Sequence, residues 1–358
     1  PFEKLEAEGG KYEEIKNATK AGVDIKTDVT NDSDTEATGV SVKSTVYNKE
    51  SDVISTQTDD ITVAAGKTET ISQSVDVANP KLWSVDSPNL YWVRTEIIQN
   101  GKVVDRTDSR FGIRYIATNP NSGFYLNGVH TKLNGVCEHS DLGSLGMETY
   151  QAAVDRRIRT LKKYGVNAIR TSHNPVSPEF IEACDRLGML VFEEAFDQWL
   201  YSKNSDDYHN YFNKAADGKT VVFDKAGNDN TNNDTSYIEV KREDLQSNAE
   251  RDIKAMVDRD KNAPCIFAWS TGNEIYDARY KHGENTLDML TGWIKEIDTT
   301  RPVAACPPTW DNYWANNAQQ EKHLAKAEMS GFNYATGQYD GAHSRYPNMV
   351  IFGSETVS

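Results

Sequence analysis

From about residue 124 onward, seven short apolar runs alternate with segments long enough to form helices. Strands separated by helical crossovers predict a parallel sheet. A TIM barrel has eight such units in about 250 residues. We therefore expect an α/β domain over residues 118–358, a (β/α)8 TIM barrel that is incomplete at its C-terminus. The predicted strands are 131–139, 166–174, 189–196, 264–274, 302–308, 329–334 and 348–355.

The segments between these runs predict helices at 149–164, 177–187, 241–260, 285–298 and about 319–328. A long insertion, about 200–238, separates the third strand from its helix and contains the run "DKAGNDNTNNDTS". Loops of this length are usually either functional lids or disordered, and the sequence leaves both readings open.

Residues 12–117 follow a different pattern, in which β-branched and polar residues alternate in runs such as "GVDIKTDVTN" and "LYWVRTEII". Alternation with a period of two indicates half-buried antiparallel strands. About seven strands in roughly 100 residues are typical of an immunoglobulin-like sandwich. The expected architecture is a multidomain β plus α/β protein, with residues 1–11 as the end of a preceding domain or a linker.

Composition excludes several classes of partner. The net charge of −15 lacks the basic footprint of a nucleic-acid-binding protein. No run of about 18 apolar residues is present, so no membrane span is expected. The four cysteines lie far apart without metal-binding spacing, which predicts reduced thiols and favours the cytoplasm. Since the chain starts without Met, we expect a longer protein, and any secretion signal would lie outside this chain. A homo-oligomer is compatible with the sequence.

Polar side chains gather where the predicted strands end. Because catalytic residues of a TIM barrel lie at the carboxyl ends of its strands, six of the seven strands would deliver titratable or amide groups to one rim. This convergence is the strongest functional signal in the chain. The groups are His139 and Asp141, Arg170 and His173, Glu194 and Asp197, Asn273 and Glu274, Asn333 and Tyr334, and Glu355.

Two of these carboxylates, Glu274 and Glu355, end the fourth and seventh strands. Retaining glycoside hydrolysis requires such a pair, one to protonate the leaving oxygen and one to attack the anomeric carbon. Asn273 could bond a sugar 2-hydroxyl, while Tyr334 and Arg170 could hold Glu355 ionised. We therefore predict Glu274 as acid/base and Glu355 as nucleophile. Trp199, Trp310 and Trp314 follow strand ends and are candidates either for stacking on sugar faces or for core and lid packing.

The motifs "GFYLNGVHTKLNGVCEHSDLGSLG", "APCIFAWSTGNE" and "IFGSETVS", with "FGIR" in the sandwich, resemble family 2 of the glycoside hydrolases. That family contains β-galactosidases, β-glucuronidases and β-mannosidases. The resemblance implies net retention with the same roles for Glu274 and Glu355. It also implies that His139 and His173 contact substrate and that Arg170, Asn273 and Tyr334 support the carboxylates. Glu194 and Asp197 match the acidic positions after the third strand.

The chain departs from this family in two ways. Well-known β-galactosidases bind Mg²⁺ through a histidine after the third-strand acid, but "AFDQW" follows Glu194 here, so we predict no metal and no cofactor. The family's jelly-roll domain and eighth strand are not in this chain, so the chain alone is expected to be inactive. The motifs favour β-D-galactosides as the carbohydrate substrate and leave β-glucuronides open.

Two readings from other classes stay open. A metal-dependent barrel hydrolase would use His139, Asp141, His173 and Glu194 as ligands, although such sites usually place two histidines one residue apart after the first strand. A non-catalytic carbohydrate-binding protein would need neither glutamate.

Overall fold

The computed structural model describes residues 18–199, 248–279, 281–308 and 318–357. Several predicted features lie outside these ranges: residues 1–11, the whole insertion at 200–238, the start of the helix predicted at 241–260, and both Trp310 and Trp314. The chain divides into two compact units. The first extends to residue 115 and includes 125–129 and 262–264, and the second contains the remaining residues.

The first unit is a sandwich of antiparallel strands. One sheet pairs two strands, and the other has the order β3-β2-β5-β6. The strands are β1 (Lys20–Thr30), β2 (Ala37–Asn48), β3 (Val53–Val63), β4 (Thr68–Ala78), β5 (Tyr91–Gln99) and β6 (Lys102–Phe111), with β1 paired to β4. About seven strands were expected. Within the described residues, the segment between β4 and β5 forms an isolated antiparallel bridge between Trp83 and Pro88 and no further strand.

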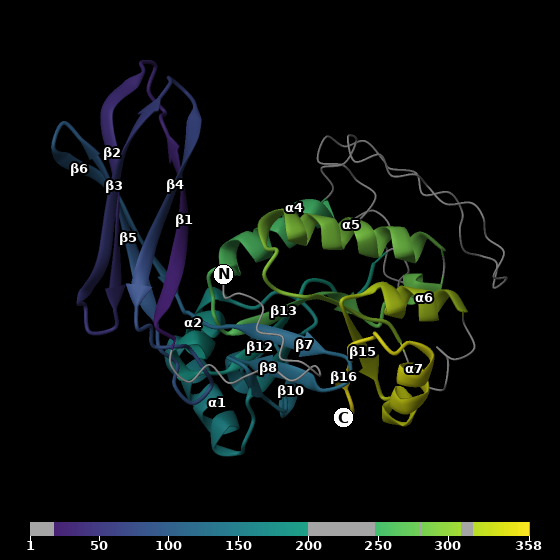
Figure 1. Cartoon of the computed structure of the whole chain (residues 1–358). Coiled ribbons are helices and arrows are strands. Elements are labelled where there is room, and N and C mark those ends of the chain that lie inside the picture. The colour runs from purple at the N-terminus through teal and green to yellow at the C-terminus, as the bar shows by residue number, and fades with distance from the viewer. Residues whose placement is uncertain (1–17, 200–247, 280, 309–317, 358) are drawn as a thin grey trace. The chain divides into compact units, whose positions relative to one another are not determined.

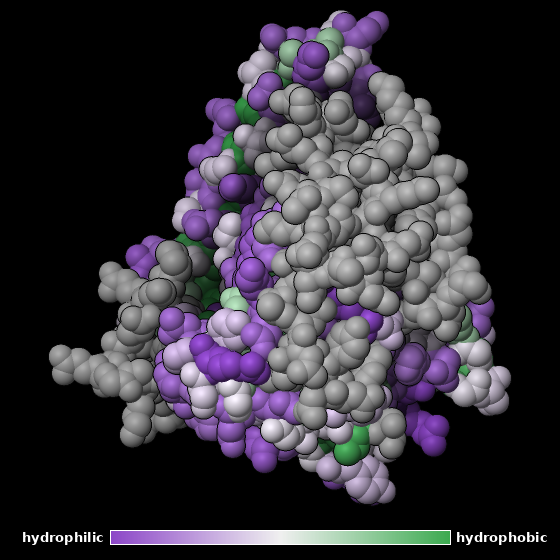
Figure 2. Space-filling view, turned by 90° about the vertical axis from the view of Figure 1, so that its right-hand side faces the viewer, coloured by the Kyte–Doolittle hydropathy of each residue, from purple (hydrophilic) through white to green (hydrophobic). Residues whose placement is uncertain are grey.

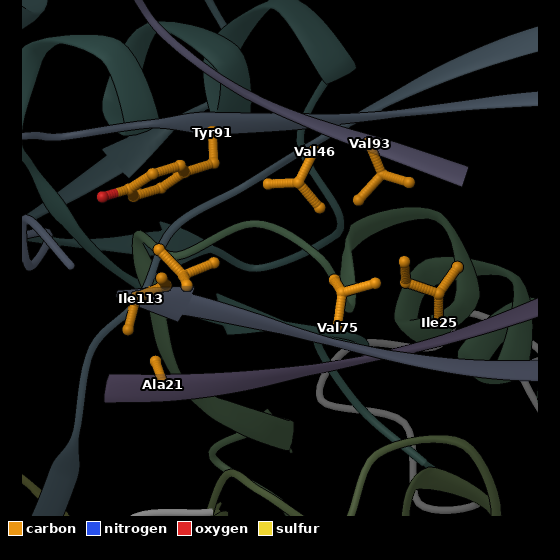
Figure 3. Packing of buried hydrophobic residues seen from close by; sticks show 8 residues of the cluster. Ala21, Ile25, Val46, Val75, Tyr91, Val93 and Ile113 are labelled. Atoms are coloured by element: carbon orange, nitrogen blue, oxygen red, sulfur yellow. The ribbon is translucent and has the colours of Figure 1, made fainter. Parts of the chain in front are cut away.

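Alternation along the strands creates the core of the sandwich (Figure 3). On β4, for example, Gln73, Val75 and Val77 are buried while the residues between them are exposed, as a period of two requires. The Oγ of Ser44 donates to the Oε1 of Gln73 at 2.6 Å, so this buried polar pair joins the two sheets and is satisfied. The core cluster consists of Ala21, Ile25, Val46, Val75, Val77, Tyr91, Val93 and Ile113.

The second unit contains a seven-stranded parallel sheet in which spatial order equals chain order, from β10 to β16 (Figure 1). Such an order is what successive βα units produce in a TIM barrel. The strands are β10 (Gly135–His139), β11 (Ala168–Ser172), β12 (Leu190–Glu194), β13 (Ile266–Asn273), β14 (Val303–Cys306), β15 (Met329–Asn333) and β16 (Ile351–Glu355). A small separate sheet contains β7 (Ile116–Asn119), β8 (Gly123–Leu126) and β9 (Val129–His130).

Helices connect successive strands of this sheet. In α2, Ser177 caps the N-terminus by accepting from the Phe180 N–H, and Gly188 ends the helix in the left-handed conformation at φ 75°. Its apolar face buries Phe180 and Ile181. The helices are α1 (Gln151–Lys163), α2 (Pro178–Leu187), α4 (Asn248–Asp260), α5 (Lys281–Ile297), α6 (Ala318–Lys326) and α7 (Tyr339–Arg345). Short 3₁₀ turns occur at η1 (Gly143–Leu145), η3 (Tyr276–Arg279) and η6 (Thr336–Gln338).

Contacts across the sheet show that it curls into a barrel. The rings of Phe192 on β12 and Phe352 on β16 lie 5.2 Å apart, although these strands are not neighbours. Phe192 also contacts Phe267 at 5.9 Å, and Phe267 contacts Phe124 of β8 at 5.2 Å. These four rings form an apolar layer inside the barrel, which we call the phenylalanine layer.

The surface agrees with the acidic composition. On the face shown in Figure 2, hydrophilic residues predominate among those described, and apolar ones occur mostly singly. In the parts of the chain that the structure describes, no helix has the length and apolarity needed to cross a membrane.

Candidate active site

Arg170, on β11, is the centre of the polar end of the barrel. Its side chain is 5% exposed and donates to the carboxylates of two strands: Nη1 to Oε1 of Glu355 at 2.7 Å and Nη2 to Oε2 of Glu194 at 2.8 Å. Nη2 also donates to Oδ1 of Asn273 at 2.8 Å. A buried guanidinium is stable only when its N–H groups have hydrogen-bond acceptors and its charge is paired. The contacts of Arg170 therefore link β11, β12, β13 and β16.

Glu194 is fully buried at the end of β12 and is satisfied on both oxygens. Ser270 donates to Oε2 at 2.7 Å, alongside Arg170. The Nδ1 of His173 lies 2.7 Å from Oε1, and since an ionised carboxylate only accepts, Nδ1 carries the proton. The other ring nitrogen, Nε2, then lies 3.6 Å from Oε1 of Glu355. Glu194 therefore orients the histidine toward Glu355.

Glu355 ends β16 and has a pKa below its ordinary value. Burial raises this pKa, but the hydrogen bond and charge of Arg170 outweigh burial, and a hydrogen bond from Tyr334 and the charge of His173 act in the same direction. The Glu355 backbone carbonyl also accepts from the Tyr334 N–H at 2.6 Å. The site thus holds Glu355 as an ionised carboxylate near neutral pH.

Glu274 follows β13 directly and has its own partners. Asn333, at the end of β15, donates through Nδ2 to Oε1 of Glu274 at 3.3 Å. Both Glu274 and Tyr334 have left-handed backbones, with φ of 46° and 53°. For residues other than glycine this conformation is strained by about 1–3 kcal/mol, and such strain concentrates at functional sites.

A cavity of about 460 Å³ adjoins these groups. His173 and Asp197 line it on one side, and Met256 and Arg259 of α4 line it on the other. Asp197 accepts from Nδ2 of Asn273 at 3.2 Å, so the cavity wall and the carboxylate cluster share residues.

The structure separates the predicted residues into three groups. It brings together Arg170, His173, Glu194, Asp197, Asn273, Glu274, Tyr334 and Glu355 through the contacts described above. His139 lies at the edge of this cluster, with its ring 5.4 Å from that of His173. Trp310 lies outside the described residues.

Trp199 does not fit the role of a sugar platform. Its side chain is fully buried, and its Nε1 donates to the Thr271 carbonyl at 2.9 Å. An indole with no exposed face cannot stack on a sugar ring, so Trp199 packs against the barrel wall and supports the end of β13.

Two of the four residues considered as metal ligands have other partners. Within the described ranges, no three His, Cys, Asp or Glu side chains are grouped so that they could hold one. Of the four residues considered as ligands, His173 and Glu194 are bonded to each other, and Glu194 is further engaged by Arg170 and Ser270.

The sequence did not reveal the small polar residues that satisfy the cluster. Ser270 donates to the Glu194 carboxylate, and Thr171 accepts from the Glu194 backbone N–H. The available signal was a polar residue at an inward position of an otherwise apolar strand. The sequence alone does not say which side chain such a residue contacts.

A parallel barrel with carboxylates and an arginine at the carboxyl ends of its strands is typical of TIM-barrel enzymes. The chain belongs to family 2 of the glycoside hydrolases. The model for "Glycosyl hydrolases family 2, TIM barrel domain" matches residues 118–319, and that for "Glycosyl hydrolases family 2" matches 11–114.

Several known proteins are similar to this chain. A beta-galactosidase of Bacteroides ovatus is 30% identical, covering 95% of this chain and 39% of that protein. A putative beta-glucuronidase of Formosa agariphila is 36% identical over 64% of this chain and 18% of its own length. The crystal structure of a family 2 member from Bacteroides cellulosilyticus matches with a TM-score of 0.78 and 32% identity, covering 94% of this chain and 38% of that one. The chain thus spans about two fifths or less of these proteins.

Proposed function

We propose that the protein containing this chain is a retaining β-glycosidase, with Glu355 as nucleophile and Glu274 as acid/base. The observation that carries this proposal is the 2.7 Å ion pair between Arg170 and Glu355, which keeps one rim carboxylate ionised. Glu274 follows a different strand, β13, and accepts from the neutral amide of Asn333 at 3.3 Å. Two carboxylates in different environments are what double displacement requires.

In the first step, a carboxylate oxygen of Glu355 attacks the anomeric carbon while Glu274 protonates the departing glycosidic oxygen. Since Arg170 occupies Oε1 of Glu355, we assign the attack to Oε2. The C–O bond to the leaving group breaks as the bond to Oε2 forms, which gives a glycosyl ester.

In the second step, Glu274, now ionised, takes a proton from water, and the resulting hydroxide oxygen attacks the anomeric carbon. The ester bond breaks, Glu355 returns to its ionised form, and the configuration is retained. Asn273 has a second N–H on Nδ2, beyond the one given to Asp197, that could bond the sugar 2-hydroxyl.

For the sugar we propose a β-D-galactoside. In support, the beta-galactosidase relative aligns with 95% of the chain, whereas the putative beta-glucuronidase, which favours the alternative, aligns with 64%. Initial rates of the complete protein on nitrophenyl β-galactoside, β-glucuronide, β-glucoside and β-mannoside measure this preference. A β-glucuronide rate above the β-galactoside rate would reverse the assignment of sugar.

The roles of the carboxylates are tested by Glu355→Gln in the complete protein. Because glutamine cannot form the ester, we expect turnover of an aryl β-glycoside to fall at least about 1000-fold. A 2-deoxy-2-fluoro glycoside with a good leaving group should lose that group and add the mass of its fluoroglycosyl group to the peptide containing Glu355, in the wild type only.

The matched control is Glu138→Gln. Glu138 lies on β10 and pairs with Arg157 at 2.9 Å, away from the Arg170 cluster. We expect its turnover to stay within about threefold of the wild type, since this partly buried pair has no contact with Arg170, Glu274 or Glu355. Near-normal turnover of Glu355→Gln would contradict the proposal.

A further inference from the structure

Asn333 has contacts that neither the fold nor the mechanism so far accounts for. Its side chain is fully buried at the end of β15, between the strands of the two carboxylates. Nδ2 donates to Oε1 of Glu274 at 3.3 Å and to Oδ1 of Asn273 at 3.1 Å. Oδ1 accepts from the Oγ of Ser354 at 2.6 Å. One amide group therefore contacts the proposed acid/base and the residue that directly precedes the proposed nucleophile.

The backbone reinforces this connection. Asn333 and Glu355 are register partners, and the register shifts by a bulge between Phe332 and Asn333. Such a bulge re-aims the side chains that follow it. A glycine at 331 leaves room for the contact, because a Cβ there would meet Ser354 Oγ at 2.7 Å and Cys306 Sγ at 2.5 Å.

A second route of hydrogen bonds runs parallel to the first. Asn273 Oδ1 accepts from both Asn333 and Arg170, and Arg170 donates to Glu355. The two routes form a closed ring through strands β11, β13, β15 and β16. Asn333 is the member of that ring that reaches Glu274.

We propose that Asn333 is a positioning residue that holds the Glu274 carboxyl in the orientation for proton donation, with Ser354 fixing the Asn333 amide. This inference rests on the proposed glycosidase function. Because the Asn333 side chain is fully buried, we expect it to act through Glu274 rather than by contact with the sugar or the leaving group.

The chemistry provides a readout that a general loss of structure does not affect. A dinitrophenolate departs without protonation, whereas a methoxide leaves only when an acid donates a proton to it. General acid catalysis contributes about 100- to 10,000-fold to such a step. A misplaced Glu274 should therefore slow the methyl glycoside far more than the dinitrophenyl glycoside of the same sugar.

The test measures kcat/KM of the complete protein for these two glycosides and takes their ratio, dinitrophenyl over methyl. For Asn333→Ala we expect the ratio to rise at least about tenfold, with less than about threefold change for the dinitrophenyl glycoside. Both values come from one preparation, so a partly unfolded sample leaves the ratio unchanged. The matched control is Ser330→Ala on the same strand, whose buried Oγ donates only to the Leu324 carbonyl at 2.8 Å, and which should keep the wild-type ratio.

Ser354→Ala provides a second arm if Asn333→Ala does not fold. It removes the hydroxyl that holds the Asn333 amide and should raise the ratio about threefold. A wild-type ratio in whichever of these variants folds, or an equal rise in Ser330→Ala, would overturn the positioning role. A wild-type protein that cleaves neither glycoside and forms no fluoroglycoside adduct would instead overturn the proposed function, and the positioning role with it.

Discussion

Two neighbouring glutamates on β12, Glu193 and Glu194, are both fully buried, yet they have opposite surroundings. Glu194 meets Arg170, His173 and Ser270 in the barrel interior. Glu193 meets Arg259 at 3.2 Å and the nearby carboxyl of Asp260 on α4. Burial raises the pKa of Glu193 well above its ordinary value, and the charge of Asp260 raises it further, while Arg259 opposes them.

Burial alone therefore does not decide whether a carboxyl group is protonated or ionised. Successive side chains of a strand face opposite sides, so two adjacent glutamates are presented to two unrelated sets of partners. On the inner face a guanidinium and a hydroxyl surround the carboxylate. On the outer face a second carboxyl group favours the neutral acid. Substituting each glutamate separately tests whether the inner face alone serves the proposed reaction.

The largest effect is expected for Glu194→Gln. Removing this charge leaves Arg170 with Glu355 as its remaining ion-pair partner and frees His173 from its orienting bond. We expect kcat/KM for an aryl glycoside to fall about 100-fold or more. The free energy of unfolding should fall by about 3 kcal/mol, because breaking a buried ion pair is strongly destabilising. Kinetics and urea unfolding measure both, and unchanged activity would remove the distinction between the two faces.

An intermediate effect is expected for Tyr334→Phe. The lost hydroxyl stabilises the ionised form of Glu355, so the Glu355 pKa rises when it is removed. The acid limb of the kcat/KM profile reports this pKa and should move to higher pH, with less than about tenfold loss at the plateau. A limb that stays in place, or moves to lower pH, would contradict the proposed support of Glu355 by Tyr334.

The smallest effect on activity is expected for Glu193→Gln, whose turnover should stay within about twofold of the wild type. Its stability should depend on pH in a defined direction. Above the ordinary glutamate pKa of about 4.5, the unfolded chain releases the Glu193 proton while the folded chain keeps it. The wild-type free energy of unfolding therefore falls as pH rises, and glutamine removes this loss.

Thermal unfolding at several values between about pH 5 and 8 measures the predicted difference. The melting temperature of Glu193→Gln relative to the wild type should rise with pH. A difference that is constant, or that shrinks as pH rises, would show that Glu193 is ionised in the folded protein.

The sequence was sufficient for the fold because each signal was local. Apolar runs followed by helical segments predicted the seven parallel strands, and the position of polar residues at strand ends identified the rim. Trp199 shows the limit, since its place after a strand end does not say which way its ring points. Ser270 bonds Glu194, 76 positions away, and Asn333 bonds Glu274, 59 positions away, and such pairings arise only when the strands come together in the sheet.

The phenylalanine layer also determines how molecules can exchange at this site. Phe124, Phe192, Phe267 and Phe352 pack against one another below the Arg170 cluster and give it an apolar floor. Substrate, leaving group and the hydrolytic water would then share the opening at the rim. On the proposed mechanism, the leaving group must depart through that opening before water can reach the glycosyl ester. A second sugar entering ahead of water would be an acceptor, so the width of the opening would divide the product between hydrolysis and sugar transfer.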